Sequence, residues 1–213
     1  MFDLDGVLVD SEIWWDEVRQ AFATDVGRTW TLDDREAVMG SNSRQWSETM
    51  RGRLDLDMTS QEIERAIVDG MVERYRREGA PAIDGAVSTV RRVAREWPLA
   101  LASSSHPRVI DAALDGTGLR DAFRAVVSSD EVEHGKPAPD VFLEAARRLG
   151  VEPATVLVVE DSLNGLKAGL AAGMTTVLVP NRSIPPAPGS DEIAHIVLTR
   201  IADLDPSEIG TRR

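Results

Sequence analysis

Apolar residues follow a helical spacing alone from residue 11 to about residue 80 of this chain, and after Gly85 helical stretches alternate with short apolar runs. Between residues 11 and 80 they recur every three or four positions, which predicts amphipathic helices that each pack one face on a core. We expect four or so helices in this stretch. The first covers Glu12–Val26, and its packed face is predicted to hold Ile13, Trp14, Val18, Ala21 and Phe22.

Two capping signals divide the rest of the helical stretch. Thr31-x-x-Asp34 and Thr59-x-x-Glu62 have the form of capping boxes at helix N-termini. The second opens a long helix whose apolar residues repeat at fours, namely Ile63, Ile67, Met71 and Tyr75.

Helices and apolar strands alternate after Gly85. The predicted helices cover residues 86–96, 107–115, 140–149 and 163–172, and the predicted strands cover 99–103, 125–128, 155–159, 176–179 and 195–198. Such alternation is typical of an α/β fold with a doubly wound, mostly parallel (Rossmann-like) sheet. We expect an α/β core formed by residues 1–10 and 83–213, with residues 11–82 inserted as a helical cap domain.

Two carboxylates mark the end of the first strand. Residues 1–4 provide barely half of a usual central strand. If Phe2 and Leu4 face a core, strand alternation points Asp3 and Asp5 together, and Gly6 follows at once. Two carboxylates held close repel each other unless a cation relieves them, and Mg²⁺ suits such oxygen ligands best.

Three further polar stretches follow strand ends or precede helices. They are Leu-Ala-Ser-Ser-Ser (101–105), Gly-Lys-Pro-Ala-Pro-Asp (135–140) and Val-Val-Glu-Asp-Ser-Leu-Asn-Gly (158–165). Together they supply a hydroxyl, an ammonium and two more carboxylates. Ligands of doubly wound sheets bind at the carboxyl ends of the strands, where all four stretches are expected.

In this order and at these separations, the four stretches resemble the four motifs of the haloacid dehalogenase-like hydrolase superfamily. Within it, the chain looks most like the branch of β-phosphoglucomutase and the small sugar-phosphate phosphatases. The resemblance implies that Asp3 is the nucleophile that forms an aspartyl-phosphate. It implies that Asp5 is the general acid toward the leaving alcohol and then the general base toward water.

The same resemblance assigns the remaining polar groups of the motifs. Metal ligands would be the Asp3 carboxylate, the main-chain carbonyl of Asp5, and Asp161 with or without Glu160. The Ser103 hydroxyl would meet a phosphate oxygen. Lys136, one of only two lysines in the chain, would neutralise phosphate and Asp3 together.

Gly6 and four other residues are candidates for binding the substrate, and each of those four has a structural alternative. Trp15 either stacks on a sugar ring or belongs to the core. Arg44 either reaches a second anionic group or is solvated, and Ser104 either binds phosphate or is a polar loop residue. His106 either lines the entrance or starts a helix at the surface.

These residues predict a Mg²⁺-dependent phosphatase of small phosphomonoesters, with a hexose or deoxyhexose phosphate as substrate. A phosphosugar mutase of the β-phosphoglucomutase type is the alternative, although that branch carries a histidine where this chain has Trp15. An alternative from another class is a phospho-accepting receiver module, which a helical insert of this size disfavours. The proline-rich stretch from Pro180 to Gly189 is interpreted as a rigid connector.

Charge and composition limit the partners. The chain has 24 basic and 36 acidic residues, a net charge of −12 and no cysteine. Nucleic acid and anionic membranes both require a basic footprint, so neither is an expected partner. We expect a cytoplasmic protein, monomeric or weakly dimeric, whose partner is a small-molecule phosphate ester.

Overall fold

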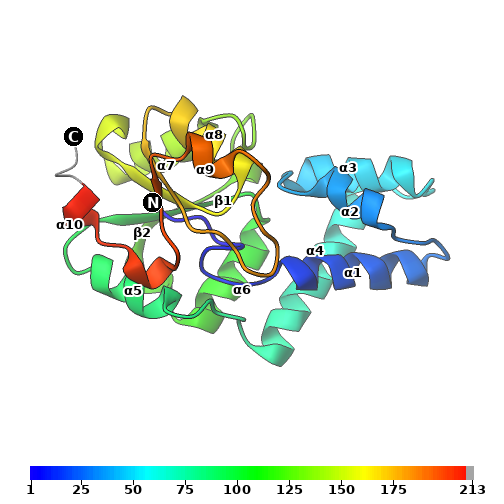
Figure 1. Ribbon diagram of the computed structural model, residues 1–213. Coiled ribbons are helices and arrows are strands. Elements are labelled where there is room, and N and C mark those ends of the chain that lie inside the picture. Colours follow the sequence, from blue (N-terminus) through cyan, green and yellow to red (C-terminus); the bar gives the residue numbers. More distant parts are fainter. Residues whose placement is uncertain (210–213) are drawn as a thin grey trace.

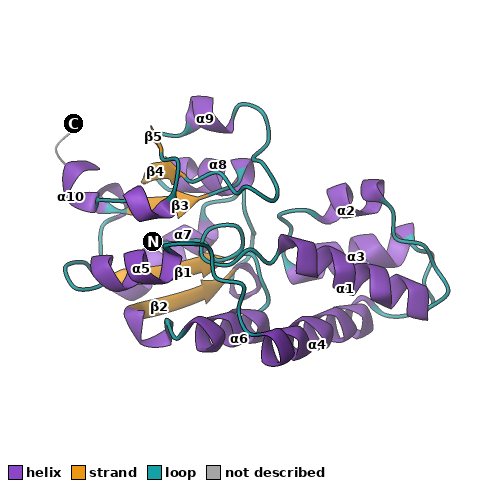
Figure 2. Ribbon diagram, turned by 60° about the horizontal axis from the view of Figure 1, so that its bottom comes forward, coloured by secondary structure: helices purple, strands orange, loops and turns teal. Residues whose placement is uncertain are grey.

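Parallel strands form one twisted sheet in the body of the molecule (Figures 1 and 2). The computed structural model describes residues 1–209, and its strands are β1 (Leu99–Ser103), β2 (Phe123–Ser128), β3 (Leu157–Glu160), β4 (Thr175–Leu178) and β5 (Ile196–Val197). β1 pairs with β2, and β4 lies between β3 and β5. Phe2 bridges Leu101 on one side and Val159 on the other, so the first residues join the two halves.

The sheet therefore has the order β2, β1, residues 1–4, β3, β4, β5, with all pairings parallel. The Phe2 amide donates to the Ala100 carbonyl at 3.0 Å, and the Asp3 amide donates to the Val159 carbonyl at 3.0 Å. The strand order reverses between residues 1–4 and β3, which is where doubly wound sheets bind ligands. The predicted doubly wound sheet is confirmed.

Helices cover both faces of this sheet. α5 (Ala86–Val93) and α6 (Pro107–Thr117) share one apolar core with Leu101 and Val159. α7 (Asp140–Leu149) and α8 (Leu163–Ala171) share the opposite core with Ala102 and Val158. The short helices α9 (Ser190–Ile193) and α10 (Pro206–Ile209) follow β4 and β5. Short 3₁₀ turns cover Arg120–Ala122, Ser129–Glu131, Pro153–Thr155 and Ile201–Asp203.

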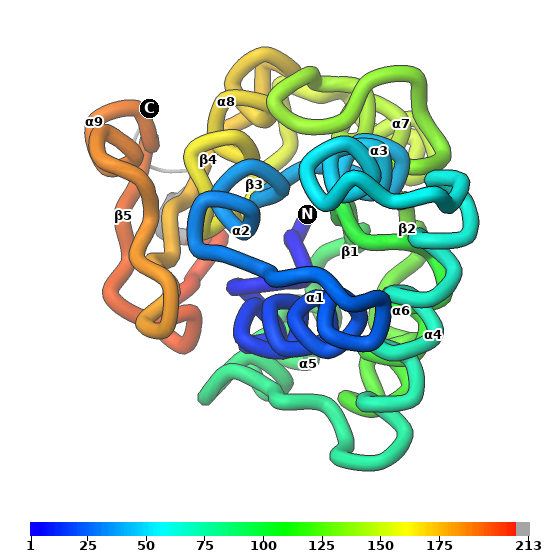
Figure 3. Tube along the Cα trace, turned by 90° about the vertical axis from the view of Figure 1, so that its right-hand side faces the viewer, coloured from blue at the N-terminus to red at the C-terminus, as the bar shows by residue number. Residues whose placement is uncertain are grey.

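The predicted helical insert forms a separate layer at one side of the body (Figure 1). It consists of α1 (Glu12–Asp25), α2 (Leu32–Val38), α3 (Ser43–Arg53) and α4 (Ser60–Glu78). The two linkers run side by side, since the Asp10 amide donates to the Pro81 carbonyl at 2.9 Å and the Ile83 amide donates to the Leu8 carbonyl at 2.9 Å. Figure 3, viewed from the side of the insert, shows α1, α2 and α3 in front of the body.

Both predicted capping boxes are confirmed, and so is the buried row of α4. A third box, Asn42 with Gln45, was not predicted. Element ends differ by a few residues: α5 ends at Val93, and β3 begins at Leu157 because a 3₁₀ turn precedes it. Within residues 1–209, none of the helices combines the length and apolar composition needed to cross a membrane.

The predicted packed face of α1 is wrong in part. Ile13 is 48% exposed and Ala21 is exposed, whereas Trp15, Arg19 and Ala23 form the buried row. The apolar pattern predicted a buried face shifted from the true one, because the middle residue of the true buried row is the charged Arg19.

Candidate active site

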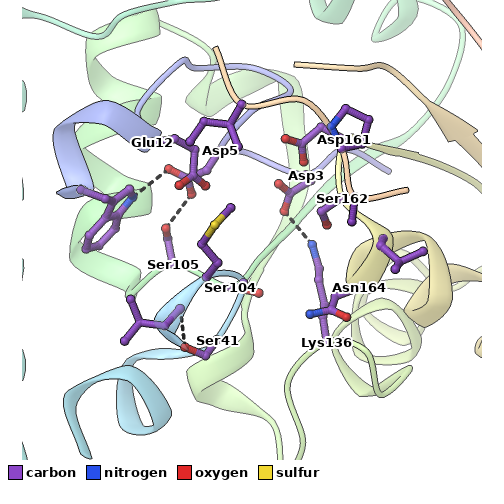
Figure 4. Close-up of a pocket in the computed structure, with 18 of the residues that line it drawn as sticks. Asp3, Asp5, Glu12, Ser41, Ser104, Ser105, Lys136, Asp161, Ser162 and Asn164 are labelled. Carbon is purple, nitrogen blue, oxygen red and sulfur yellow. Dashed lines mark hydrogen bonds and ion pairs between the residues drawn. The ribbon is translucent and has the colours of Figure 1, made fainter. Parts of the chain in front are cut away.

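A cavity of about 330 Å³ lies between the carboxyl ends of the strands and the helical insert. The body contributes the polar part of its wall (Figure 4), with Asp3, Asp5, Ser104, Ser105, Lys136, Asp161, Ser162 and Asn164. The insert contributes mainly Glu12, Trp15, Arg19, Met39, Ser41 and Trp46. Both parts of the molecule therefore shape one site.

A buried ammonium joins the first and last motifs. Lys136 Nζ donates to Asp3 Oδ1 and to Glu160 Oε1, each at 2.6 Å, and to the Ala102 carbonyl at 3.0 Å. All three side chains are almost fully buried, and the ammonium also lies 4.9 Å from the centre of the Phe142 ring. The two carboxylates raise the pKa of Lys136 despite its burial, so it stays charged. The ion pairs fix the direction of Asp3.

Asp3, Glu160 and Asp161 together can hold a metal ion, since one carboxylate oxygen of each lies within 4.8 Å of the others. Burial raises the pKa of Asp3 to about 8 and that of Asp161 well above its ordinary value, with the neighbouring carboxylates adding to the effect. One ammonium does not balance three carboxylates, so a hard cation fits this donor set.

Glu160 and Asp161 differ in how their oxygens are used. Glu160 Oε2 accepts from the amides of Asp161 and Ser162 at 3.2 and 3.3 Å and from Ser162 Oγ at 3.0 Å. Within residues 1–209, nothing hydrogen-bonds or forms an ion pair with the Asp161 carboxylate. The unpartnered Asp161 is thus the stronger candidate for a metal ligand, and Glu160 holds Lys136 and the turn after β3.

Gly6 provides the space for Asp161. Its φ is +81°, in the left-handed region that favours glycine. A Cβ at this position would lie 1.9 Å from Asp161 Oδ2. Gly6 does not line the cavity, so its contribution is to let Asp161 approach the turn after Asp3.

Asp5 is oriented by three side-chain donors. Its Oδ1 accepts from Ser11 Oγ and from Trp15 Nε1, the latter at 3.2 Å, and its Oδ2 accepts from Ser105 Oγ at 2.6 Å. Ser11 and Trp15 begin the insert, whereas Ser105 follows β1. The Asp5 carboxylate is therefore held where insert and body meet, beside Asp3 on the cavity wall (Figure 4).

The structure brings some predicted substrate residues to the cavity and not others. Trp15 and Ser104 line it. Ser103 is fully buried, and its Oγ accepts from the Ser105 amide at 3.0 Å, so it shapes the loop below the wall. Arg44 is exposed on α3 and is not part of the wall. The ring of His106 turns to the N-terminus of α6, where Nδ1 accepts from the Arg108 amide at 3.1 Å, so His106 does not line the cavity either.

Other wall residues were not predicted as site residues. Glu12 and Arg19 lie three residues before and four residues after Trp15, so helical periodicity alone would have placed them on its face. The segment 184–187 also lines the cavity, which corrects its interpretation as a connector alone. It is held by Ser183 Oγ, which donates to Asp10 Oδ2 at 2.5 Å, and by Asn181 Oδ1, which accepts from the Ser183 amide at 2.7 Å.

A family model described as haloacid dehalogenase-like hydrolase matches residues 1–173, so the chain belongs to the haloacid dehalogenase-like hydrolases. This confirms the predicted family and hydrolase class, and it excludes the receiver module.

Several relatives match most of the chain. It is 33% identical to a probable pseudouridine-5'-phosphatase of Drosophila melanogaster, over 99% of this chain and 92% of that protein. It is 32% identical to hexitol phosphatase B of Escherichia coli K12, over 84% of this chain and 82% of that protein. Among solved structures, CbbY of Rhodobacter sphaeroides in complex with phosphate is similar with a TM-score of 0.83 and 24% identity, over 95% of this chain and 94% of that one. A β-phosphoglucomutase of Clostridium difficile has a TM-score of 0.81 and 22% identity, over 98% of this chain and 93% of that one.

Proposed function

We propose that this protein is a phosphatase of small phosphomonoesters, sugar phosphates above all. The observation that supports this best is the placement of the Asp3 carboxylate. Lys136 orients it, and it lines a cavity whose wall also includes Asp5 and Asp161. The relatives named above as phosphatases agree with it.

The reaction follows from the placement of the two aspartates. Asp3 attacks the phosphorus and forms an aspartyl-phosphate, while the bond to the leaving oxygen breaks and Asp5 gives that oxygen its proton. Asp5 then takes a proton from a water molecule, which attacks the same phosphorus and releases inorganic phosphate and the Asp3 carboxylate. Lys136 offsets negative charge throughout because it stays protonated.

The residues present fit Mg²⁺. The proposed ligands are the carboxylates of Asp3 and Asp161 and the main-chain carbonyl of Asp5. When bound, the ion would neutralise the negative charge of the transferred phosphate. Glu160 is proposed to support the site by holding Lys136 rather than as a principal ligand.

We propose residues 11–82 as the cap that closes over the substrate. The cap supplies Glu12, Trp15, Arg19 and Trp46 to the wall, and it joins the body through the two adjacent linkers. Closure would exclude water and select the leaving alcohol, and opening would release it.

Hydrolysis is favoured over the mutase alternative by Trp15. Its indole N–H donates to Asp5 where the mutase branch carries a histidine. The indole N–H of tryptophan is a hydrogen-bond donor only and is neither acidic nor basic near neutral pH, so Trp15 offers no second acid or base beside Asp5.

The test is release of inorganic phosphate with and without Mg²⁺, from hexitol, ketohexose, deoxyhexose and polyol phosphates and from p-nitrophenyl phosphate. We expect multiple turnovers with at least one sugar or polyol phosphate, loss of turnover in Asp3→Asn, and no change in Asp121→Asn, which removes one exposed aspartate far along the chain. A separate arm offers β-glucose 1-phosphate with a bisphosphate primer. Conversion to glucose 6-phosphate without phosphate release would make the protein a mutase, and full activity of Asp3→Asn would exclude Asp3 as the nucleophile.

A further inference from the structure

Arg19 is a buried cation that has no ion-pair or hydrogen-bond partner in the described part of the chain. It is 7% exposed, and it lies on the wall of the same cavity as Asp3. Within the part of the chain that the structure describes, its guanidinium makes no hydrogen bond and no ion pair, and its Nε is buried and unbonded. Burying a charge without a counter-charge is costly, so such a group needs a reason in the working state of the protein.

Two indole rings hold the guanidinium in place. The Arg19 Cζ lies 5.0 Å from the centre of the Trp15 ring and 5.4 Å from that of Trp46, and the two rings are 6.3 Å apart. Cation–π contacts stabilise the charge but use none of its five N–H donors. The donors therefore stay available in an orientation that the rings restrict.

No neighbouring acid forms an ion pair with Arg19 in the described part of the chain, although Glu12, Asp16 and Asp5 act on it from a distance and oppose the fall in its pKa. Asp16 accepts from Trp30 Nε1 at 2.8 Å and lies 3.8 Å from Arg35. Glu12 lines the same cavity as Arg19, but the two side chains form no ion pair. Burial lowers the pKa of Arg19 to about 10, so it remains charged at neutral pH. Burial raises the pKa of Glu12 to about 7, so Glu12 is only partly ionised there.

We propose that Arg19 determines specificity by binding an oxyanion of the substrate, a carboxylate or a second phosphate, on the leaving group. This inference rests on the proposed phosphatase function and adds the class of substrate. A planar guanidinium fork matches a carboxylate or phosphate in two parallel hydrogen bonds, and the anion supplies the missing charge. A neutral sugar offers hydroxyls that pair with the donors but leaves the buried guanidinium without an ion-pair partner.

The test compares matched substrates that differ in one anionic group. Glucitol 6-phosphate is paired with 6-phosphogluconate, and fructose 1-phosphate with fructose 1,6-bisphosphate. Dissociation constants are measured by calorimetry with Mg²⁺ in the Asp3→Asn variant, and kcat/KM is measured with the unmodified protein. We expect the anionic member of at least one pair to bind about 10- to 100-fold more tightly, as for charge-assisted hydrogen bonds to a buried group.

Variants of Arg19 separate recognition from packing. Arg19→Met keeps an apolar stem between the two indoles and should remove the preference for the anionic member, while Arg19→Lys should restore part of it. Arg35→Met removes a nearby cation that is not on the cavity wall and should leave the preference intact. Tighter binding of the neutral members, or an equal loss for both members in Arg19→Met, would overturn the inference. Absence of turnover with every substrate would instead refute the proposed phosphatase.

Discussion

Asp3→Asn should remove activity and yet stabilise the metal-free protein. Burial raises the pKa of Asp3 from 3.8 to about 8. At pH 7 the unfolded chain holds this carboxylate ionised, so folding must take up a proton or bury a charge. The cost is about 4 kcal/mol, from roughly three pH units at about 1.4 kcal/mol each. An amide avoids it.

The folded pKa of about 8 already includes the attraction of Lys136, which lowers it, and Lys136 keeps Glu160 as its ionic partner in the variant. We expect the variant to be more stable by about 2–4 kcal/mol at pH 7, or about 4–16 °C in Tm for a chain of this size. Because the folded pKa is raised, the carboxyl's contribution to stability is full below the unfolded pKa near 4 and is lost as the pH rises through about 8. The difference in the free energy of unfolding between Asp3→Asn and the unmodified protein should therefore increase from pH 5 to pH 8.

The assay is urea unfolding with EDTA at several pH values between 5 and 8.5, with Asp121→Asn as the control for loss of one negative charge from a chain of net charge −12. Added Mg²⁺ should stabilise the unmodified protein more than Asp3→Asn and narrow the gap, because a ligand of the folded state raises its stability by mass action. If Asp3→Asn is less stable at pH 8 in EDTA, the carboxylate is a net favourable partner of Lys136 and the reasoning fails.

Three further changes test other parts of the site. Gly6→Ala places a Cβ 1.9 Å from Asp161 Oδ2 at a φ of +81°, so activity should fall and the strained backbone should cost about 1–2 kcal/mol in urea unfolding. Asp161→Asn should raise the Mg²⁺ concentration for half-maximal activity by ~10-fold or more while circular dichroism stays unchanged, whereas an unshifted Mg²⁺ titration would exclude Asp161 as a ligand. Trp15→Phe keeps a ring beside the cavity but removes the N–H to Asp5, so kcat should fall by about 10-fold; an unchanged kcat would show that this hydrogen bond does not orient Asp5.

The part of the candidate site that the body contributes was predictable because it depends on local features of the chain. Asp3 lies near the end of the short first strand, Ser104 and Asp161 directly follow β1 and β3, and parallel strands bring those ends to one edge. Lys136 lies in a proline-containing loop that leads into α7. Once the strand order was inferred, these residues had to meet, and the structure places them together.

The part of the candidate site that the insert contributes was less predictable because it depends on how the insert packs against the body. The apolar pattern of α1 did not predict that Arg19 is buried, because its burial is stabilised by Trp46 from a different helix. His106 lies near the site, but its ring Nδ1 accepts a hydrogen bond from the Arg108 amide in the first turn of α6, which turns the ring away from the cavity. Segment 184–187 is held at the cavity in part by the contact between Ser183 and Asp10, which are far apart in sequence. Such long-range contacts leave no periodic signal.

Two side chains of opposite charge that lack an ion-pair partner in the described residues lie on the wall of one cavity, and they predict that the proposed metal and the proposed substrate favour each other's binding. Asp161 lacks a cation on the body side, and Arg19 lacks an anion on the side of the insert. Mg²⁺ alone would satisfy only Asp161, and a substrate with a second oxyanion would satisfy Arg19 as well. If both proposals hold, closure of the cap is favoured when metal and substrate are bound together, because only then is no charge in the closed cavity buried without its counterpart.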